Sequence, residues 1–494
     1  MFTTAPRAEQ GNDLSPLSVR DQTLNTLHSG SCYLTKSGVL IASLLCVMWL
    51  LNAMCAHLEY TGVSIVGAAL LSVASLLLLK HILHYWNSII LLFWITHTLY
   101  GISGPFSWYF SIEGLPLIEH INFGNIYIIL YSLSSFSFIL GIFIIQKSIN
   151  SSIKDLYKCN YAAISLCALF FAAIAATIEV NSIRQIGLSE ISGKGAYHLQ
   201  ASQIDPLSVG TTLGLLSCAF IAFLLGNPLA PLSFRRNSLL AWILVISPVL
   251  VSSLLIGKRG FIVSTVLCYL ILSHVYRKIE KIKISLIINL IFLYLFGVLT
   301  FITRGTIVQI AAGQLSWDTL TDTVVEHTMS FLNPAAIEFG APFVNFNLFY
   351  SMVDKIELRY GETYIRGLTS ILEYILYGRR SPSISEEFNI MFFSQDVSRG
   401  IGWGFSSLVE AYWNFGIAGT IVVYFLFARA LFVLENKVKN SSFSPLHLIY
   451  ALLIPVVILF HRSNFGLTFW LFPIILGTIA FSLYMLLGSI LARR

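Results

Sequence analysis

The stretch GVLIASLLCVMWLLNAMCAH, residues 38–57, decides the fold, because it contains no Asp, Glu, Lys or Arg. About 20 apolar residues in a helix cross the roughly 30 Å hydrocarbon core of a bilayer. Similar stretches follow at 60–79, 86–101, 125–145, 161–179, 206–225, 239–256, 261–276, 284–303, 413–434, 447–460 and 466–491. We therefore predict an all-α, polytopic membrane protein with about 12 transmembrane helices.

The composition excludes an ordinary soluble protein. Of the 494 residues 56% are hydrophobic and 11% are charged, whereas a soluble domain has about 25% charged residues. The polar N-terminal tail, 1–37, lacks the apolar core and cleavage site of a secretory signal, so we expect the first span to be the anchor. The seven cysteines all lie outside 304–412, which indicates neither a disulfide framework nor a cysteine-based metal site.

The positions of Lys and Arg predict the orientation. With an even number of spans both ends lie on one side, and the segments on that side carry most of the basic residues, including Lys147, Arg235 and Arg277. Basic residues favour the cytoplasmic side. We therefore expect a cytoplasmic tail at 1–37, nine helices within 38–303, a large periplasmic loop at 304–412, and three helices within 413–494 with a cytoplasmic C-terminus.

The large loop at 304–412 is too long to be a simple connection. Apolar residues recur at helical spacing from 364 to 377, and Gly378 follows as a helix cap would. A second amphipathic stretch covers 317–329. We expect short helices there that lie on, or dip toward, the outer boundary between membrane and water.

The basic residues on the predicted outer side are mostly arginines. A planar guanidinium binds phosphate oxygens through two hydrogen bonds and keeps its charge. Arg259, Arg304 and Arg462 lie at the mouths of predicted spans, where an unpaired charge is costly. An anionic, membrane-bound ligand is one explanation. The alternative is that they reach lipid headgroups or pair with carboxylates, with candidates Glu113, Glu119, Glu179 and Glu338.

Other motifs narrow the chemistry. The chain has no P-loop, no HExxH and no nucleophile elbow, so nucleotide-driven transport and zinc or serine hydrolysis lack support. We expect no metal, no cofactor and no nucleic-acid partner. Glu410 lies in SLVEAYWNFG just before the tenth predicted span, where an unpaired carboxylate would be costly.

Several short motifs resemble the bacterial O-antigen polymerases, the Wzy-type oligosaccharide repeat-unit polymerases. They lie mainly within 250–470 and surround the large loop. They are GKRG at 257–260, TRG at 303–305, YGETYIRGL at 360–368, GRRSPS at 378–383, GWGFSSLVEAYWNFG at 402–416 and HRSNFG at 461–466.

The resemblance implies a metal-independent, inverting membrane glycosyltransferase of the C type in the bacterial inner membrane. Its donor and acceptor would be undecaprenyl-pyrophosphate-linked oligosaccharides at the periplasmic face, and a chain-length regulator would be a partner. The implied pyrophosphate ligands are Arg259, Arg304 and Arg462, with Arg366 and Arg380 as helpers. Prepositioned guanidinium groups would stabilise the charge that builds on the leaving pyrophosphate.

A general base would take the proton of the attacking hydroxyl. Glu410 is the first candidate and His461 the second; the alternatives are a structural partner for an arginine and a helix-end histidine bonded to backbone. Tyr364, Trp403 and Tyr412 are candidates for stacking on sugar rings, although aromatic residues at a membrane boundary ordinarily form the interfacial belt.

Three other functions remain open. A lipid-linked oligosaccharide flippase or other transporter would place charges deep in its spans and often has broken helices and an inverted repeat, whereas the predicted spans are nearly free of charge. An O-antigen ligase would share the donor site but use lipid A as acceptor. A structural scaffold leaves the arginines on the predicted outer side unexplained.

Overall fold

The computed structural model describes residues 36–83, 85–86, 88–111, 123–143, 159–186, 206–227, 230–256, 259–272, 310, 316–319, 322, 339–377, 382–398, 404–439, 441, 443–463 and 468–492. Within these residues every regular element is a helix. The all-α prediction is therefore confirmed.

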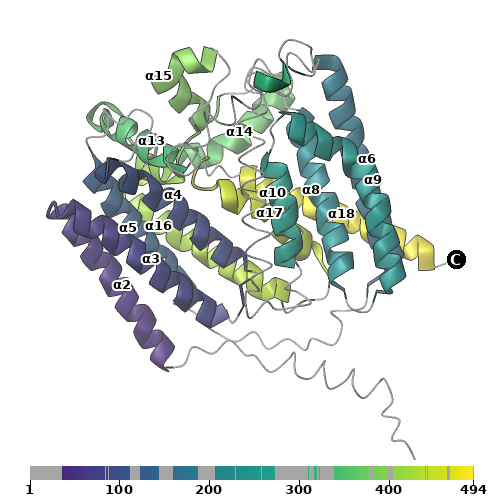
Figure 1. Cartoon of the computed structure of the whole chain (residues 1–494), viewed down its shortest axis with the longest axis horizontal. Helices are drawn as coiled ribbons and strands as arrows, with labels where there is room; N and C mark the ends of the chain where they lie inside the picture. The colour runs from purple at the N-terminus through teal and green to yellow at the C-terminus, as the bar shows by residue number, and fades with distance from the viewer. Residues whose placement is uncertain are drawn as a thin grey trace, which may run out of the picture.

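The helices form two groups joined by a central one (Figure 1). One group contains α2 (Lys36–His57), α3 (Thr61–Leu83), α4 (Ile89–Tyr109), α5 (Gly124–Phe143) and α16 (Ser407–Lys439). The other contains α6 (Tyr161–Ile186), α8 (Pro206–Gly226), α9 (Leu232–Ile256), α10 (Arg259–Leu272) and α18 (Thr468–Ala492). The helix α17 (Pro445–Leu459) contacts members of both groups.

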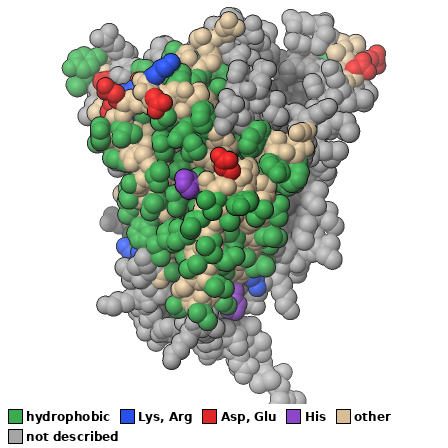
Figure 2. All heavy atoms as spheres, turned by 90° about the vertical axis from the view of Figure 1, so that its left-hand side faces the viewer, with side chains coloured by type: hydrophobic (Ala, Val, Ile, Leu, Met, Phe, Trp, Pro, Cys, Tyr) green, Lys and Arg blue, Asp and Glu red, His purple; other side chains and the backbone are tan. Residues whose placement is uncertain are grey.

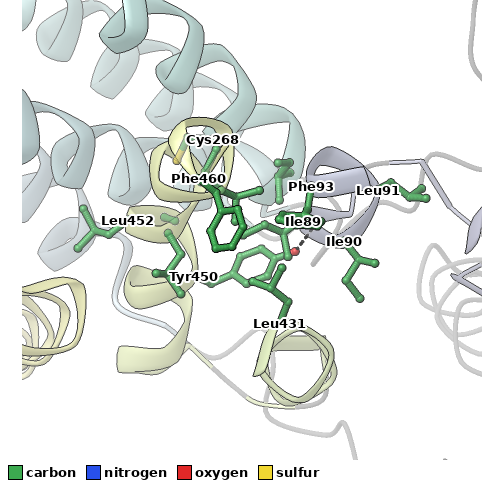
Figure 3. Close-up of a cluster of buried hydrophobic side chains, with 14 of the residues drawn as sticks. Ile89, Ile90, Leu91, Phe93, Cys268, Leu431, Tyr450, Leu452 and Phe460 are labelled. Carbon is green, nitrogen blue, oxygen red and sulfur yellow. Dashed lines mark hydrogen bonds between the residues drawn. The ribbon is translucent and has the colours of Figure 1, made fainter. Parts of the chain in front are cut away.

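The core where the two groups meet is built from large apolar side chains. Phe93 of α4, Cys268 of α10, Leu431 of α16 and Tyr450 of α17 are all buried and lie close together (Figure 3). The hydroxyl of Tyr450 also accepts a hydrogen bond from the N–H of Ile89, at 3.2 Å. The start of α4 is thereby fixed against α17.

Eight described helices are long and apolar enough to cross a membrane, and α8, α10 and α17 contain shorter apolar segments. Every predicted span coincides with a described helix except 284–303, which lies outside the described residues. The polytopic membrane architecture is confirmed, while the number twelve stays a prediction. Hydrophobic side chains cover much of one flank of the molecule, and several acidic and basic ones gather near one end (Figure 2).

The loop region adds α13 (Ala341–Tyr350), the 3₁₀ turn η5 (Val353–Lys355), α14 (Glu362–Tyr377) and α15 (Ile384–Ser398). They lie at one end of the bundle, which we call the loop end (Figure 1). The amphipathic helix expected at 364–377 is confirmed as α14. Of the stretch expected at 317–329, only 317–319 and 322 are described, and they are helical.

One helix of this region was not predicted, and another begins earlier than expected. The helix α13, which the sequence analysis did not predict, has Phe343, Phe346 and Phe349 buried against the spans. The helix α16 begins at Ser407, six residues before the predicted span start at 413. Its additional turns carry Glu410 into the protein interior, rather than leaving it just ahead of the helix.

Candidate active site

A break in α16 creates the local geometry of the loop end. Phe415 (φ −140°, ψ 16°) and Gly416 (φ 62°, ψ −148°) interrupt the helix, and a positive φ of this kind favours glycine. A break leaves carbonyl groups of the preceding turn without their intrahelical donors. Here the carbonyl of Trp413 accepts from the N–H of Arg359 at 3.0 Å, and that of Asn414 from the N–H of Tyr360 at 3.1 Å. The segment 359–361 therefore attaches to α16 beside the break.

Side chains extend this attachment into the first turn of α14. The Gly361 N–H donates to Oδ1 of Asn414 at 2.9 Å, and Nδ2 of Asn414 donates to Oγ1 of Thr363 at 2.7 Å. The Thr363 hydroxyl in turn donates to Oε1 of Glu410 at 2.8 Å. Glu410, Asn414 and Thr363 are all buried. YGETYIRGL and SLVEAYWNFG, which are far apart in the sequence, thus form one hydrogen-bonded unit.

An ion-pair network joins α14 to α15. Arg359 pairs with Glu362 at 3.1 Å and with Glu387 at 3.5 Å, and Arg366 pairs with the same two carboxylates. The guanidinium of Arg359 also lies over the ring of Trp413, 5.3 Å from its centroid. The hydrogen bond from Arg366, more than that from Arg359, lowers the pKa of Glu362.

An open pocket of about 370 Å³ lies on this network. Its lining residues are Glu362, Ile365, Arg366, Thr369, Glu373, Pro382 and Glu387. The lining combines hydrogen-bond acceptors, a guanidinium donor and an apolar wall, which is the composition of a site for a polar organic ligand. Because Arg366 already pairs with two carboxylates, little of its positive charge is left to attract an anion.

The motifs GWGFSS and HRSNFG meet beside this unit. The Phe405 N–H donates to the carbonyl of Arg462 at 2.8 Å, and Gly404, with a φ of 75°, packs directly against Arg462. Asn389 of α15 donates to the carbonyl of Gly404 at 3.0 Å. The half-buried Arg462 is therefore held next to the start of α16, the helix that carries Glu410.

His461, the residue before Arg462, lies in an aromatic cluster. Its ring centroid is 4.9 Å from that of Phe93 and 5.0 Å from that of His97, and its side chain is buried. Its Nε2 has no hydrogen-bond partner among the described residues. It lines a cavity of about 10 Å³ together with His97, Tyr131 and Tyr424, a size that holds about one water molecule.

The two remaining described aromatic candidates lie in different surroundings. Tyr364 stacks on Phe415 with ring centroids 6.4 Å apart, and burial followed by the charge of Glu410 raises the pKa of its phenol well above 10. Tyr412 packs on the rings of α13, 5.7 Å from Tyr350. Tyr364 therefore belongs to the unit around Glu410, whereas Tyr412 belongs to the contact between α13 and α16.

The other predicted site residues are placed only in part. Arg259 is the first residue of α10, and its side chain lies outside the described part of the structure. Arg304, Arg380 and Trp403 also lie outside it. The structure thus brings Glu410, Arg366 and Tyr364 together at one junction, and His461 and Arg462 beside it.

Two carboxylates lie at the ends of predicted spans, Glu179 as the last residue of 161–179 and Glu435 directly after 413–434, and both fall within described helices. Glu179 of α6 is buried and accepts a hydrogen bond from Ser252 of α9 at 3.0 Å. Glu435 of α16 accepts one from Ser88, at the start of α4, at 2.7 Å, and it pairs with Lys439. These contacts join neighbouring helices.

Sequence reasoning missed Thr363, Asn414, Arg359, Glu387 and His97. Asn414 stands four residues after Glu410 and Arg366 four residues after Glu362, and residues at this spacing share a helix face. That spacing could have identified Asn414 as a neighbour of Glu410. Nothing in the sequence singles out His97, since its environment arises from packing between α4, α5 and the end of α17.

Comparison with known proteins agrees with the motifs. A family model described as O-antigen polysaccharide polymerase Wzy matches residues 37–493. No curated protein and no solved structure matches the chain. Because the family model covers nearly the whole chain, the protein belongs to the O-antigen polysaccharide polymerase Wzy family.

Proposed function

We propose that the protein joins undecaprenyl-pyrophosphate-linked oligosaccharide repeat units at the periplasmic face of the bacterial inner membrane. The family supports an O-antigen repeat-unit polymerase in a membrane. The observation that carries the site is the meeting of 359–366, 404–405, 410–414 and 461–462 at one end of a helical bundle. Such a site can bind the polar part of a lipid whose tail stays in the bilayer.

The proposed reaction is an inverting glycosyl transfer without a metal. A hydroxyl oxygen of the acceptor repeat unit attacks the anomeric carbon of the growing chain and forms the new glycosidic bond. The bond from that carbon to the pyrophosphate oxygen breaks, and undecaprenyl pyrophosphate leaves with the electron pair. The hydroxyl proton passes to a base. The energy of the reaction is already present in the donor, so no nucleotide is needed.

Guanidinium groups would stabilise the leaving pyrophosphate, since its charge grows in the transition state. Arg462 is the described residue best placed for this role, because its backbone is fixed by Phe405 next to the start of α16. Arg259, Arg304 and Arg380 remain proposed ligands from the sequence. Arg366 would contribute less, because two carboxylates already balance its charge.

His461 is the base that the geometry favours. A general base needs a free lone pair within reach of the proton that it takes, and Nε2 of His461 lacks a hydrogen-bond partner among the described residues and lines a cavity. Oε1 of Glu410 already accepts from Thr363 and the side chain is fully buried. The cavity beside His461 must widen before a sugar hydroxyl reaches it.

The open pocket on α14 and α15 is the proposed place for part of the repeat unit. The pocket carboxylates can accept hydrogen bonds from sugar hydroxyls, and the guanidinium of Arg366 can donate hydrogen bonds to the oxygens of those hydroxyls. Tyr364, Trp403 and Tyr412 remain proposed contacts for sugar rings. A protein that regulates chain length is a proposed partner by family resemblance alone.

The test is polymerisation by the purified full-length protein in liposomes. The substrate is a single lipid-pyrophosphate-linked repeat unit, and the products are separated on a gel. A ladder of lengths without added lipid A supports the polymerase. Transfer only when lipid A is present indicates a ligase, and movement of the substrate across the bilayer without any new bond indicates a transporter. Either of these results would overturn the proposal.

A further inference from the structure

Glu410 lies at the centre of a buried hydrogen-bonded unit that no predicted role requires. We propose that Glu410 is a positioning residue, which with Thr363 and Asn414 anchors the first turn of α14 on α16 and so holds Arg359, Arg366 and the neighbouring pocket in place. This inference rests on the proposed function. It replaces proton transfer by Glu410 with a structural contribution to substrate binding.

The orientation of the Asn414 amide follows from its neighbours. The Gly361 N–H is a donor, so the atom of Asn414 that faces it at 2.9 Å is Oδ1. The carbonyl of Glu410 is an acceptor, so the atom that faces it at 2.7 Å is Nδ2. The second hydrogen of Nδ2 therefore points to Oγ1 of Thr363, at 2.7 Å.

The direction of the Thr363 hydrogen bond follows in turn. A hydroxyl has one hydrogen to donate, and Oγ1 already accepts from Asn414. Its hydrogen therefore goes to Oε1 of Glu410, at 2.8 Å. The order of donation is Asn414 to Thr363 to Glu410. Both a carboxylate and a side-chain amide have an oxygen that can accept the hydrogen bond made by this Glu410 oxygen.

The burial of the unit argues against direct contact with the acceptor sugar. Glu410 is 0% exposed and Thr363 is 2% exposed. A sugar hydroxyl could reach Glu410 from the side of Thr363 only if the start of α14 left α16. That movement would also break the three hydrogen bonds donated by the backbone of Arg359, Tyr360 and Gly361. Buried groups whose partners are removed are costly, so the contacts form a fixed anchor.

The anchor acts on charged groups directly beside it. Glu362 precedes Thr363, and Arg366 follows it by three residues on the same helix. Both line the open pocket, and both belong to the ion-pair network with Arg359 and Glu387. Loosening Thr363 from Glu410 should therefore displace the pocket without removing any group that contacts the substrate.

The decisive variant is Glu410→Gln. Its amide keeps an acceptor oxygen for Thr363, so polymerisation should stay within about threefold of wild type, whereas loss of a general base typically costs about 10²- to 10⁴-fold. Glu410→Ala and Thr363→Val remove the contact and should lower the rate at least about tenfold. Thr363→Ser keeps the hydroxyl and should restore the rate. The Thr363→Val defect should lie mainly in KM for the lipid-linked repeat unit.

A second measurement does not depend on activity. Limited proteolysis of the full-length protein, mapped by mass spectrometry, should show new cleavage within 359–377 for Glu410→Ala and Thr363→Val, but not for Glu410→Gln or Thr363→Ser. Wild-type protein that makes no polymer would refute the proposed function, and the proteolysis pattern would still test the anchor. A large rate loss in Glu410→Gln with normal proteolysis, or wild-type behaviour of Glu410→Ala, would overturn the inference.

Discussion

Arg366 of α14 forms an ion pair with Glu387 of α15, and this contact joins the two loop helices across the pocket that they line. Arg366 also pairs with Glu362, four residues earlier in α14. A guanidinium between two carboxylates is suited to orient hydroxyl groups, and it has little net charge left to attract a diphosphate. These two ion pairs therefore favour a role of Arg366 in sugar binding over a role in pyrophosphate binding.

Glu387→Gln should slow polymerisation roughly tenfold at low substrate, because the pocket loses a charged acceptor and α15 loses an ion pair to α14. The measurement is the initial rate of repeat-unit joining at several substrate concentrations. The matched control is Glu357→Gln, since Glu357 is exposed and outside the pocket. Faster polymerisation by Glu387→Gln would instead show that freeing Arg366 helps pyrophosphate binding.

Arg462→Ala and Arg259→Ala should leave membrane insertion and abundance unchanged and abolish long glycan chains, leaving single repeat units on the acceptor. The reason is loss of charge stabilisation on the leaving pyrophosphate. Arg462→Lys should recover only part of the activity, because a lysine cannot form the two parallel hydrogen bonds of a guanidinium. Gel analysis of the glycan checks both results.

The control for these arginines is Arg236→Ala, since Arg236 is an exposed residue near the start of α9. It should give wild-type chain lengths. If Arg462→Ala and Arg259→Ala both gave wild-type chain lengths as well, the assignment of these two residues to the pyrophosphate would be wrong.

The sequence predicted the helices better than the site. Uninterrupted apolar stretches identify α2 and α3 directly, because the bilayer requires such stretches. The helix α14 was predictable because one face of it is apolar. By contrast, α13 is apolar on most of its surface, and a short buried helix of this kind has no distinguishing period.

The site was predictable as a set of motifs but not as an arrangement. Glu410, Arg366 and Tyr364 were selected for their chemistry and neighbouring motifs, and the structure brings them together. Their partners were not predictable, because the contact between 359–363 and 410–414 depends on the break at Phe415 and Gly416. The donors to the carbonyls at this break come from a segment far away in the sequence, so no periodic pattern in the sequence indicates the contact.

His461→Phe should retain the packed ring and lose the nitrogen that takes the proton, so polymerisation should fall by about 10²- to 10⁴-fold. Binding of undecaprenyl pyrophosphate, measured with the purified variant, should be unchanged, since Arg462 remains. The matched control His81→Asn, at an exposed position in α3, should polymerise normally. Near-normal polymerisation by His461→Phe would show that the reaction uses another base or none.

Gly416→Ala tests whether the break in α16 is required. A Cβ at this position would meet no atom within 4 Å, so any effect comes from the backbone angle rather than from a clash. An alanine held at a φ of 62° and a ψ of −148° costs about 1–3 kcal/mol. The variant should therefore unfold at lower temperature and should loosen the attachment of 359–361.

The control is Gly488→Ala in the last turns of α18, where a Cβ has only ordinary contacts and alanine favours the helix by about 0.5–1 kcal/mol. The temperature of thermal unfolding and the rate of polymerisation should both be lower than wild type in Gly416→Ala. Both should stay at or above the wild-type values in Gly488→Ala. Equal behaviour of the two variants would mean that α16 can continue through residue 416 as a regular helix.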